Sequence, residues 1–369
     1  MPGVKVLHVL DSYRNLEAQY FAHIAARASG DYPTNFAALG ESDRFSFTGW
    51  THERPVQPLG GSSRTKLLST PFPLVRTIRR LGIGMVHAHF FFPTLVGLMA
   101  SRLAGVPFVF TRHHSDHNSR LGKPFHVAID RWCGRLSDRA IAVSAATRDC
   151  MIADGVPPRK IRVVYNGTDG LRAPTPDSVA SVKGELSLPA DARLVLMVAR
   201  LHEEKGHATL FKALEELESA APNVWAVLAG DGPARAEIEK EIETRLLRVR
   251  VLGRRNDIAR LMVAADVLVL PSRAESFGYV LIEAMGLGLP IVASRCGGVV
   301  EIIEDGRSGL LFDIDDAHGL ARCLKRLFSD NLLRAAMAEE GKRRAHDFTF
   351  ERMIRGYEAI YGEVIAART

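Results

Sequence analysis

The stretch RLVLMVARLHEEKGHATLFKALEELESA, residues 193–220, decides the fold. Its first part, residues 193–200, is a short apolar run that predicts a buried strand, and residues 208–220 have apolar side chains at helical spacing. Arg200 and Lys205 therefore lie in the turn that leaves the carboxyl end of a strand. In open α/β sheets ligands bind at this edge, where backbone N–H groups at the start of the next helix favour anions.

Three further features follow in order: a Gly-Asp-Gly-Pro turn at residues 230–233, a Glu-Ser-Phe-Gly loop at residues 275–278, and Glu283. Two phosphates need cationic side chains, and arginine offers a planar fork of donors while lysine offers a compact point charge. If most of the segment from Glu275 to Glu283 is helical, the two carboxylates lie roughly 12 Å apart. That exceeds the roughly 5 to 9.5 Å typical of glycoside hydrolases. The series predicts a site for a nucleotide diphosphate joined to a polar group, with the glutamates at opposite ends, although chance spacing is the alternative for the glutamate pair by itself.

Short apolar strands alternate with helical patterns along most of the chain, which predicts parallel sheets covered by helices. The predicted strands are VKVLHVL (4–10), MVHAHF (85–90), PFVFT (107–111), RAIAV (139–143), IRVVY (161–165), RLVLMV (193–198), VWAVLAG (224–230), RVRVL (248–252), DVLVL (266–270) and PIVAS (290–294). Residues 166–179 hold turn residues and two prolines, and we interpret them as the link between two domains. The full length of 369 residues is sufficient for two domains of ordinary size.

These segments resemble the retaining glycosyltransferases of family 4, which have the two-domain GT-B fold. VARLHEEKG (198–206) is similar to the phosphate-binding segment of that family, and ESFGYVLIEAMGLGLPIVAS (275–294) is similar to its Glu-x7-Glu segment. CGGVVEIIEDGRSGLLF (296–312) is similar to the glycine-rich stretch that follows. Residues 86–111 and 137–169 resemble the acceptor-side half, so the resemblance covers nearly the whole chain.

The resemblance implies an α/β protein in which two Rossmann-like domains face each other across a cleft. The implied parts are an acceptor-side domain (1–172), a nucleotide-sugar-binding domain (173–350) and a C-terminal helix (351–369) that crosses back to the first domain. The implied reaction moves a sugar from a UDP- or GDP-linked donor to an acceptor hydroxyl, with retained anomeric configuration and with no metal or other cofactor. The catalytic residues would be His113, Arg200, Lys205 and Glu275, and the donor-binding residues would be Glu283, Ser276, Phe277, Gly278, Gly230 and Asp231. Base contacts would come from the loop around residues 253–257.

Histidines gather at two places in the first half of the chain. His87 and His89 are one residue apart, and RHHSDH (112–117) differs at one position from the His-x-His-x-Asp-His signature of metallo-β-lactamase-like hydrolases. Arg112 stands where the first ligand of that signature would be. Such clusters suit zinc, so a metal-dependent hydrolase is one alternative.

The family resemblance gives the second histidine cluster a different role. A histidine just after this strand faces the donor sugar in the family, and Thr-x-His matches residues 111–113. We therefore expect this role for His113, with His114 as the next candidate. The alternative for either residue is that it caps a loop by hydrogen bonding.

The chain departs from the family after its first strand, where many members carry a Gly-Gly turn. Here the loop is DSYRNLEAQY (11–20), and a side chain at Leu16 would hinder close approach of the backbone to a ligand. Arg14 and Asn15 are candidates to replace the lost contacts to acceptor or phosphate. Ordinary surface-loop status is the alternative.

Charge is unevenly distributed. Residues 1–172 hold 22 Lys and Arg against 12 Asp and Glu, a net charge of +10, whereas the remaining residues carry −4. The basic half favours anionic substrates or an anionic membrane surface, and residues 64–80 mix Phe72 with arginines in a way that suits peripheral membrane contact. A solvated helix face is the alternative. No nucleic-acid recognition signature is present, so we expect no nucleic-acid partner.

The sequence has no apolar run of the roughly 18 to 20 residues that a spanning helix needs, and its four cysteines are scattered. We expect a cytoplasmic protein of glycan biosynthesis, with peripheral contact at the inner membrane face as a hypothesis. The acceptor could be a glycan, a lipid-linked intermediate or a small molecule. Asp313 and Asp315 have the spacing of a metal-binding triplet, but they follow GLLF in a peripheral loop that we interpret as a turn. A sugar-nucleotide epimerase and a noncatalytic nucleotide-sugar binder are the two further alternatives.

Overall fold

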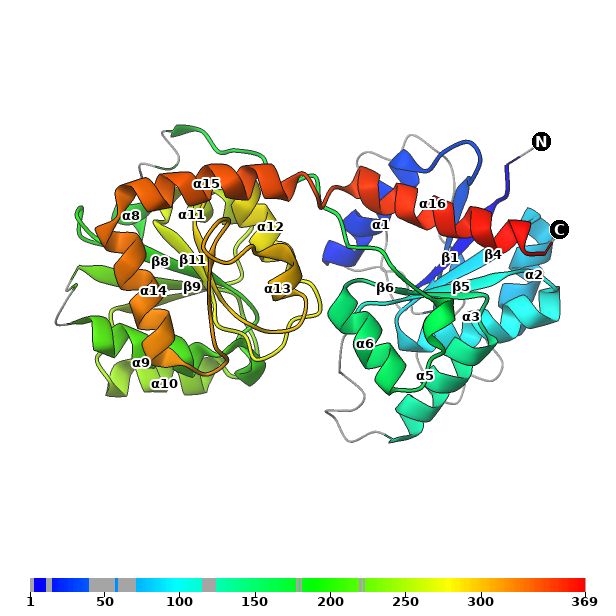
Figure 1. Cartoon of the computed structure of the whole chain (residues 1–369), viewed down its shortest axis with the longest axis horizontal. Helices are drawn as coiled ribbons and strands as arrows, with labels where there is room; N and C mark the ends of the chain where they lie inside the picture. The colour runs from blue at the N-terminus through cyan, green and yellow to red at the C-terminus, as the bar shows by residue number, and fades with distance from the viewer. Residues whose placement is uncertain are drawn as a thin grey trace. The chain divides into compact units, whose positions relative to one another are not determined.

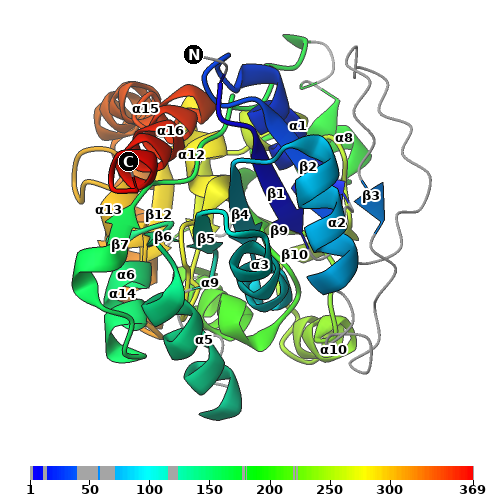
Figure 2. The same ribbon diagram turned by 90° about the vertical axis from the view of Figure 1, so that its right-hand side faces the viewer.

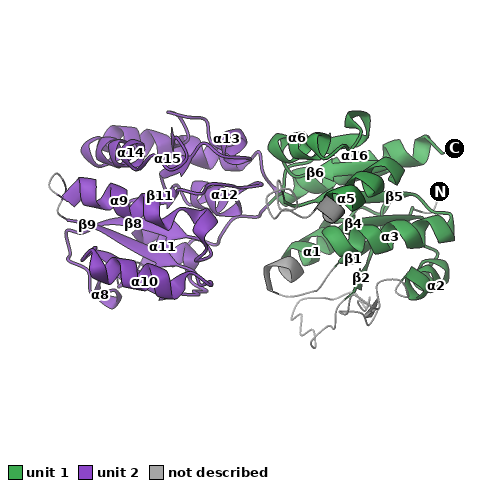
Figure 3. Ribbon diagram, turned by 90° about the horizontal axis from the view of Figure 1, so that it is seen from below, with its two compact units in different colours: residues 1–167, 350–369 green, residues 168–349 purple. Residues whose placement is uncertain are grey.

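The computed structural model describes residues 3–10, 15–39, 57–58, 71–114, 124–176, 179, 181–218, 221 and 223–368. The chain forms two compact units (Figure 3). Unit 1 joins residues 1–167 to residues 350–369, and unit 2 consists of residues 168–349. The chain therefore passes between the units twice. Within unit 2 the Thr168 N–H donates to the Phe348 carbonyl oxygen at 3.0 Å, which ties the two passages together.

The described residues of unit 1 form a parallel sheet of seven strands in the order β3-β2-β1-β4-β5-β6-β7 (Figure 1). The strands are β1 (Val6–Leu10), β2 (Thr34–Ala38), β3 (Gln57–Pro58), β4 (Met85–His89), β5 (Phe108–Arg112), β6 (Arg139–Ala142) and β7 (Ile161–Val163). The helices are α1 (Asn15–Arg27), α2 (Pro71–Leu81), α3 (Phe91–Ala104), α5 (Pro124–Leu136), α6 (Ala145–Ala153), η2 (Pro158–Lys160) and α16 (Phe350–Ala366). Strand β1 lies between β2 and β4, so the strand order reverses between β1 and β4. A reversal of this kind marks the usual ligand-binding crevice of an open α/β sheet.

Successive side chains of each strand point to opposite faces of the sheet. Leu7 and Val86 lie on the face covered by α2, α3, α5 and α6, whereas Val6 and Met85 lie on the face covered by α1 and α16 (Figure 2). Alternation places the histidines of β1 and β4 on the second face. They therefore lie on the side of the sheet covered by α1 and α16, opposite the layer that contains Leu7 and Val86.

The C-terminal helix α16 belongs to unit 1, as the predicted fold class requires. Its buried residues Met353, Tyr357, Tyr361 and Val364 recur every three or four positions, which places them on one side of the helix. They join the core formed by β1, β4, β5 and α1. The chain thus returns from unit 2 to complete the second face of the unit 1 sheet.

The described residues of unit 2 form a parallel sheet of six strands in the order β10-β9-β8-β11-β12-β13. The strands are β8 (Arg193–Val198), β9 (Val224–Ala229), β10 (Val249–Gly253), β11 (Val267–Leu270), β12 (Ile291–Ser294) and β13 (Leu310–Phe312). The helices are α8 (Val182–Glu185), η3 (Glu203–Lys205), α9 (His207–Glu218), α10 (Arg235–Thr244), α11 (Ile258–Ala264), α12 (Tyr279–Gly286), α13 (Val299–Ile302), α14 (Ala317–Ser329) and α15 (Asn331–Ala345). Here the order reverses between β8 and β11, so the loops after these two strands meet at the sheet's carboxyl edge.

The fold class predicted from the sequence is confirmed, and each of the ten predicted strands is present within a residue or two of its predicted limits. The structure adds β2, β3 and β13. These three are short or begin with polar residues, so neither length nor apolar periodicity distinguished them from loops. Among the described residues, no helix is both long enough and apolar enough to cross a membrane.

Candidate functional site

Lys205 lies at the carboxyl edge of the unit 2 sheet, in η3 between β8 and α9. Gly206 follows with a φ of 72°, a left-handed conformation that glycine adopts readily. A Cβ atom at Gly206 would lie 1.9 Å from the carbonyl oxygen of Pro271, the residue that follows β11. The glycine therefore allows the loop after β8 to pack directly against the loop after β11.

An ion pair joins these two loops. Lys205 Nζ lies 2.6 Å from Glu275 Oε1, and the two side chains are only 13% and 15% exposed. The Ser272 hydroxyl donates to the same carboxylate oxygen at 3.1 Å. Two of the four predicted catalytic residues are thus in contact. Ser272 was not among the predicted site residues, although a polar residue two positions after the end of a buried strand is the signal that could have shown it.

The backbone of the Glu275 loop is held by the glycine-rich stretch after β12. Gly297 has a φ of 44°, and a Cβ atom there would lie 1.9 Å from the Glu275 carbonyl oxygen. The Gly298 N–H donates to that carbonyl at 2.9 Å. A Cβ atom at Gly298 would also come within 2.5 Å of the Ser276 carbonyl oxygen. Both glycines are therefore required for the close contact that fixes the predicted donor loop.

Helix α12 begins after Gly278, whose φ is 100°. Phe277 is 3% exposed and packs edge-on against Tyr279 and Phe348, so its side chain anchors the loop and is not available to a ligand. Any contact of Phe277 with the donor must come from its backbone. Glu283 lies further along α12, and burial raises the pKa of its carboxyl to about 7.

Arg200 is the least constrained of the predicted phosphate ligands. Its side chain is 72% exposed and pairs with Glu204, four residues further along the chain, at 2.9 Å. Exposed pairs of this kind contribute roughly 0 to 1 kcal/mol, so Arg200 can leave Glu204 for a ligand at little cost. It does not share the ion pair of Lys205 with Glu275.

The Gly230 turn packs against the same loop after β8. Gly230 has a φ of 152°, and a Cβ atom there would lie 1.8 Å from the Ala199 carbonyl oxygen. The Leu201 N–H donates to the Asp231 carbonyl at 3.1 Å, and the Asp231 carboxylate accepts from the Gly232 N–H at 2.8 Å. The predicted residues Gly230 and Asp231 therefore border Arg200. The loop at residues 253–257 joins them through a bond from Gly230 N–H to the Gly253 carbonyl at 2.8 Å.

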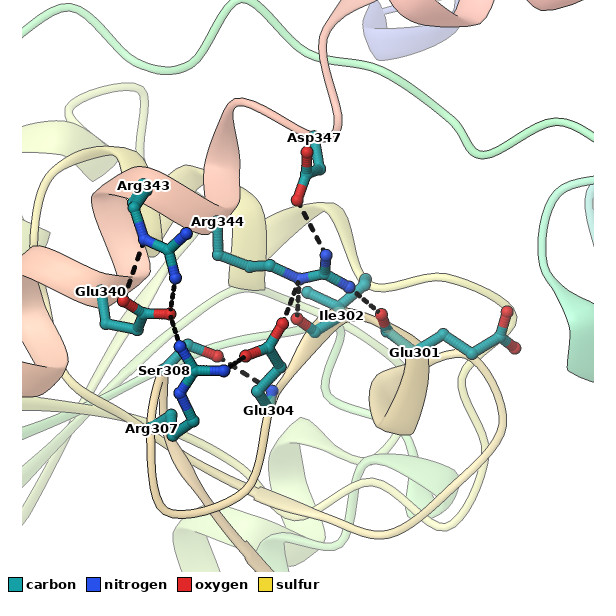
Figure 4. A network of polar contacts seen from close by, with 9 residues as sticks. All are labelled: Glu301, Ile302, Glu304, Arg307, Ser308, Glu340, Arg343, Arg344 and Asp347. Carbon is teal, nitrogen blue, oxygen red and sulfur yellow. Dashed lines mark hydrogen bonds and ion pairs between the residues drawn. The ribbon is translucent and has the colours of Figure 1, made fainter.

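A polar network around Arg344 anchors α13 (Figure 4). Arg344 donates to the carbonyls of Glu301 and Ile302 at 2.7 and 3.2 Å, and to the Asp347 carboxylate at 2.8 Å. These carbonyls end α13, which begins directly after Gly298. A charged donor at a helix C-terminus satisfies groups that have no partner within the helix.

His113 follows β5 in unit 1. Its Nε2 atom lies 3.1 Å from His89 Nδ1, the Phe90 ring stacks on it at 4.8 Å, and the Tyr20 ring meets it edge-on at 6.0 Å. Burial lowers the pKa of His113 to about 3, so the imidazole is uncharged at neutral pH. One nitrogen of the predicted sugar-facing residue is therefore already occupied within the protein.

Three more histidines lie behind His113, all fully buried. His8 Nδ1 lies 3.0 Å from His89 Nε2, while the two nitrogens of His87 contact the Tyr361 and Thr111 hydroxyls at 2.6 and 2.7 Å. One ring nitrogen from each of His8, His87 and His89 lies within 4.8 Å of the others. Burial lowers the pKa of all three, that of His8 to about 3. The sequence analysis missed His8, which pairs in register with His87 and was detectable only once β1 and β4 were known to be neighbours.

Arg112 does not act as a substitute metal ligand. Its guanidinium lies 2.6 Å from Asp154 Oδ2, and its Nε donates to the His114 carbonyl oxygen at 3.0 Å. Arg112 therefore neutralises a buried carboxylate and fixes the backbone after His113. Residues 115–117 of the predicted metal signature lie outside the described residues, as does Arg14, and the structure describes only the backbone of Asn15, the first residue of α1.

The interpretation of residues 313–315 as a turn is confirmed. They follow β13, Asp315 has a φ of 63°, and its carboxylate accepts from Arg273 Nε at 2.9 Å. Arg273 also reaches Glu203 in η3 at 2.9 Å. The carboxylate of Asp315 is therefore part of an ion-pair network at the loop surface.

Two parallel Rossmann-like units, with a charged site at the switch point of the second, define the GT-B class of glycosyltransferases. Residues 6–170 match the family model described as "Glycosyltransferase Family 4", and residues 180–344 match the model "Glycosyl transferases group 1". The chain belongs to glycosyltransferase family 4, with a second half of the group 1 type.

Named relatives agree with this assignment. The alpha-maltose-1-phosphate synthase of Mycolicibacterium smegmatis is 31% identical over 300 residues, covering 73% of this chain and 76% of that protein. The alpha-D-kanosaminyltransferase of Streptomyces kanamyceticus is 34% identical over 286 residues, 72% of each chain. The crystal structure of Anabaena HepE in complex with UDP superposes with a TM-score of 0.83 at 25% identity, covering 98% of this chain and 100% of that one.

Proposed function

We propose that this glycosyltransferase moves the sugar of a nucleotide-diphosphate sugar to an acceptor hydroxyl with retained anomeric configuration and without a metal ion. The observation that carries the proposal is the buried pair of Lys205 and Glu275 at the switch point of unit 2. In the free protein the ammonium group and the carboxylate neutralise each other's charge. Such a pair suits a donor whose phosphate oxygens bind the ammonium group and whose sugar hydroxyls bind the carboxylate.

Each charged residue would have a separate role in the transfer. Lys205 and Arg200, with the N-terminus of the twelve-residue helix α9, would neutralise the charge that grows on the departing diphosphate. Glu275 and the backbone amides of residues 276–278 would orient the donor sugar, and Glu283 would accept hydrogen bonds from the ribose hydroxyls. Gly230 and Asp231 would line the phosphate side of the same edge.

Unit 1 would supply its own ligand contacts. His113 would meet the donor sugar, and Arg14 and Asn15 would contact acceptor or phosphate, as the family resemblance implies. Anabaena HepE has been solved with UDP and with UDP-glucose, which supports a uridine nucleotide over a guanosine one for this chain. A base contact around residues 253–257 is consistent with the bond that joins that loop to Gly230.

The first experiment is a thermal-shift panel of UDP, GDP, ADP and their sugar conjugates, with and without EDTA. A nucleotide at 100 times its dissociation constant should stabilise the fold by about 2.7 kcal/mol. We expect the uridine series to do so, unchanged by EDTA. A shift that disappears on chelation, or none with any nucleotide, would contradict the proposal.

Turnover is then followed as release of the nucleoside diphosphate, with the product anomer identified by NMR. Glu275→Gln should lose most activity and keep its fold. Glu216→Gln is the matched control, because this carboxylate of α9 pairs with His318 at 2.9 Å on the surface. An inverted product would exclude retention. Release that needs no acceptor would favour an epimerase, and tight binding without turnover on broad acceptor panels would favour a noncatalytic binder.

We further propose that α2 contacts the anionic inner face of a membrane, a placement that would favour a lipid-linked acceptor over a soluble glycan or a small molecule. Leu74 and Ile78 fix this helix to the sheet, while Phe72 is 67% exposed beside the exposed Arg76 and Arg79. Cosedimentation should show binding to phosphatidylglycerol vesicles but not to phosphatidylcholine vesicles, and Phe72→Ala should weaken it. Leu332→Ala, at an 84% exposed site of unit 2, is the control. Equal binding to both vesicle types, or to neither, would leave a soluble glycan or small-molecule acceptor.

A further inference from the structure

We propose that His89, itself held by His8, is a positioning residue that fixes the tautomer of His113 and presents the Nδ1–H of that ring to the donor. This inference rests on the proposed function, because His113 is the residue expected to meet the donor sugar. It concerns two buried histidines that no ligand can reach directly. Their effect must therefore pass through hydrogen bonds to His113.

The three imidazoles form a hydrogen-bonded chain across three neighbouring strands. His8 lies on β1, His89 ends β4, and His113 follows β5. The distance is 3.0 Å from His8 Nδ1 to His89 Nε2 and 3.1 Å from His89 Nδ1 to His113 Nε2. A neutral imidazole has one N–H donor and one acceptor, so each tautomer in such a chain determines the next.

The buried end of this hydrogen-bonded row of imidazoles determines which nitrogen donates in each hydrogen bond. His8 Nε2 is fully buried and has no hydrogen-bond partner among the described residues. Buried N–H groups without an acceptor are rarer than buried acceptors without a donor. We therefore assign the bare lone pair to His8 Nε2, so His8 Nδ1–H donates to His89 and His89 Nδ1–H donates to His113 Nε2. The remaining proton of His113 is then on Nδ1, the nitrogen free to meet a ligand.

The backbone between His89 and α3 supports the same role. Phe90 has a φ of 71°, a strained conformation that is unusual for a bulky residue. Its ring stacks on His113 with an interplanar angle of 29°, and its carbonyl accepts from the Thr94 hydroxyl at 2.6 Å. The strained conformation keeps the Phe90 ring over His113 while His89 bonds the edge of the same imidazole. Together they fix both the position of the ring and its rotation.

A metal ion shared by His8, His87 and His89 fits these contacts less well. Both nitrogens of His87 are already bonded, to Tyr361 and Thr111. No carboxylate of the described residues contacts the three rings, so a buried dication would lack a compensating charge. The row of neutral imidazoles gives both nitrogens of His89 a partner and, within the described residues, leaves only His8 Nε2 and the ligand-facing His113 Nδ1 without one among these three rings.

Three substitutions at His89 separate the two bonds. His89→Asn keeps an amide group at the place of Nδ1, so it retains the bond to His113 and loses the bond to His8. His89→Gln extends its amide to the place of Nε2, so it retains the bond to His8 and loses the bond to His113. His89→Phe loses both. His87→Phe is the control, because His87 is equally buried on the same strand but bonds Tyr361 and Thr111.

The activity-independent test is the tautomer of His113, read from its side-chain 15N chemical shifts. We expect the Nδ1–H tautomer in the natural protein and in His89→Asn, and a mixture in His89→Gln. His87→Phe should leave the tautomer unchanged. An Nε2–H tautomer in the natural protein, or the same tautomer in all variants, would overturn the proposal whether or not the chain transfers sugar.

Kinetics test the consequence for transfer. A misplaced group at a reacting centre costs about 100-fold, so kcat of His89→Gln and His89→Phe should fall by about that factor with little change in KM for the donor. His89→Asn should retain most of kcat, and His87→Phe should lose thermal stability but not kcat. Equal loss of kcat in the His87 and His89 variants would show that His89 has only a structural role and does not position His113. Failure of the natural protein to turn over any nucleotide sugar would contradict the proposed function, while the tautomer result would still stand.

Discussion

Mild acid should unfold unit 1 before unit 2, because the fold of unit 1 keeps four histidines uncharged. Burial lowers the pKa of His8 and His113 to about 3, and places the pKa of His87 and His89 well below 6.5. In the unfolded chain these imidazoles titrate near pH 6.5. Their contribution to stability is therefore full above pH 6.5 and is lost as the pH falls below it, since only the unfolded chain binds the protons.

The size of the effect follows from the unfolded pKa. At pH 5.5 an unfolded imidazole is about ten times more often protonated than not, which is worth about 1.4 kcal/mol. Four such groups remove about 5 to 6 kcal/mol from the free energy of unfolding, against a typical total of roughly 5 to 15 kcal/mol. Among the described histidines of unit 2, burial lowers the pKa of only His207, to about 4. Protonation of His207 in the unfolded chain should therefore cost unit 2 only about 1.4 kcal/mol, and the raised pKa of Glu283 acts in the opposite direction, because its buried carboxyl becomes protonated as the pH falls to 5.5.

Hydrogen exchange measured by mass spectrometry at pH 7.5 and 5.5, corrected for intrinsic rates, resolves the two units. Peptides from β1, β4 and β5 should lose protection, while those from β8 and β9 should retain most of it. His8→Asn keeps a polar group where Nδ1 bonds His89 and removes one titrating ring, so the acid dependence should fall by about a quarter. A loss in unit 1 no larger than that in unit 2 would refute the reasoning, because it would mean that the histidines already titrate in the folded state.

Three further predictions concern unit 2. Gly206→Ala should lower the free energy of unfolding by about 3 kcal/mol in calorimetry, because the new Cβ atom adds backbone strain and overlaps with Pro271. The control is Gly170→Ala, which should cost about 1 to 2 kcal/mol, because Gly170 has a φ of 75° but open space around it. Lys205→Met should destabilise the fold by about 3 kcal/mol by leaving a buried carboxylate unpaired, and adding Glu275→Gln should restore stability in denaturant titrations but not turnover. Glu283→Gln should stabilise the free protein by up to about 3 kcal/mol at pH 8 and by nearly nothing at pH 4. The reason is that the carboxyl has a pKa of about 7 in the folded protein, so its ionisation lowers the free energy of unfolding as the pH rises through that value. The same variant should bind UDP more weakly, and equal melting temperatures at pH 8 would contradict this account.

The sequence predicted the parts of the structure that local pattern determines. Strand β8 and the turn with Lys205 were recognisable because a buried parallel strand is a continuous apolar run followed by loop residues. The Glu275 loop was recognisable from its glycine and its distance along the chain from Glu283. What pattern could not show was which loops touch. The pair of Lys205 with Glu275 joins residues 70 positions apart, and it depends on β11 lying beside β8.

The histidine chain shows the same limit in unit 1. His87 and His89 drew attention by their spacing, yet the sequence offered metal binding as their alternative use. His8 stands alone in an apolar run, where nothing local marks it. Only the parallel pairing of β1 with β4 brings it to His87, and only α16, which begins 342 residues after His8, covers the histidines on their side of the sheet. Long-range contacts thus decided the chemistry in both units.

The proposed ligand-binding residues at the two switch points differ in charge. In unit 2 Lys205 and Glu275 form a buried ion pair, and we propose that the donor phosphates take the place of Glu275 at the lysine. In unit 1 the residue that we propose to meet the donor is His113, whose pKa burial lowers to about 3. A nearby diphosphate favours the protonated form, and opposite charges typically raise such a pKa by roughly 1 to 3 units. His113 would then still be neutral at pH 7, so it would act as a hydrogen-bond donor and not as a general acid. The profile of kcat between pH 6.5 and 8 should therefore show no ionisation that His113→Asn removes, and a titration lost in that variant would assign His113 to proton transfer instead.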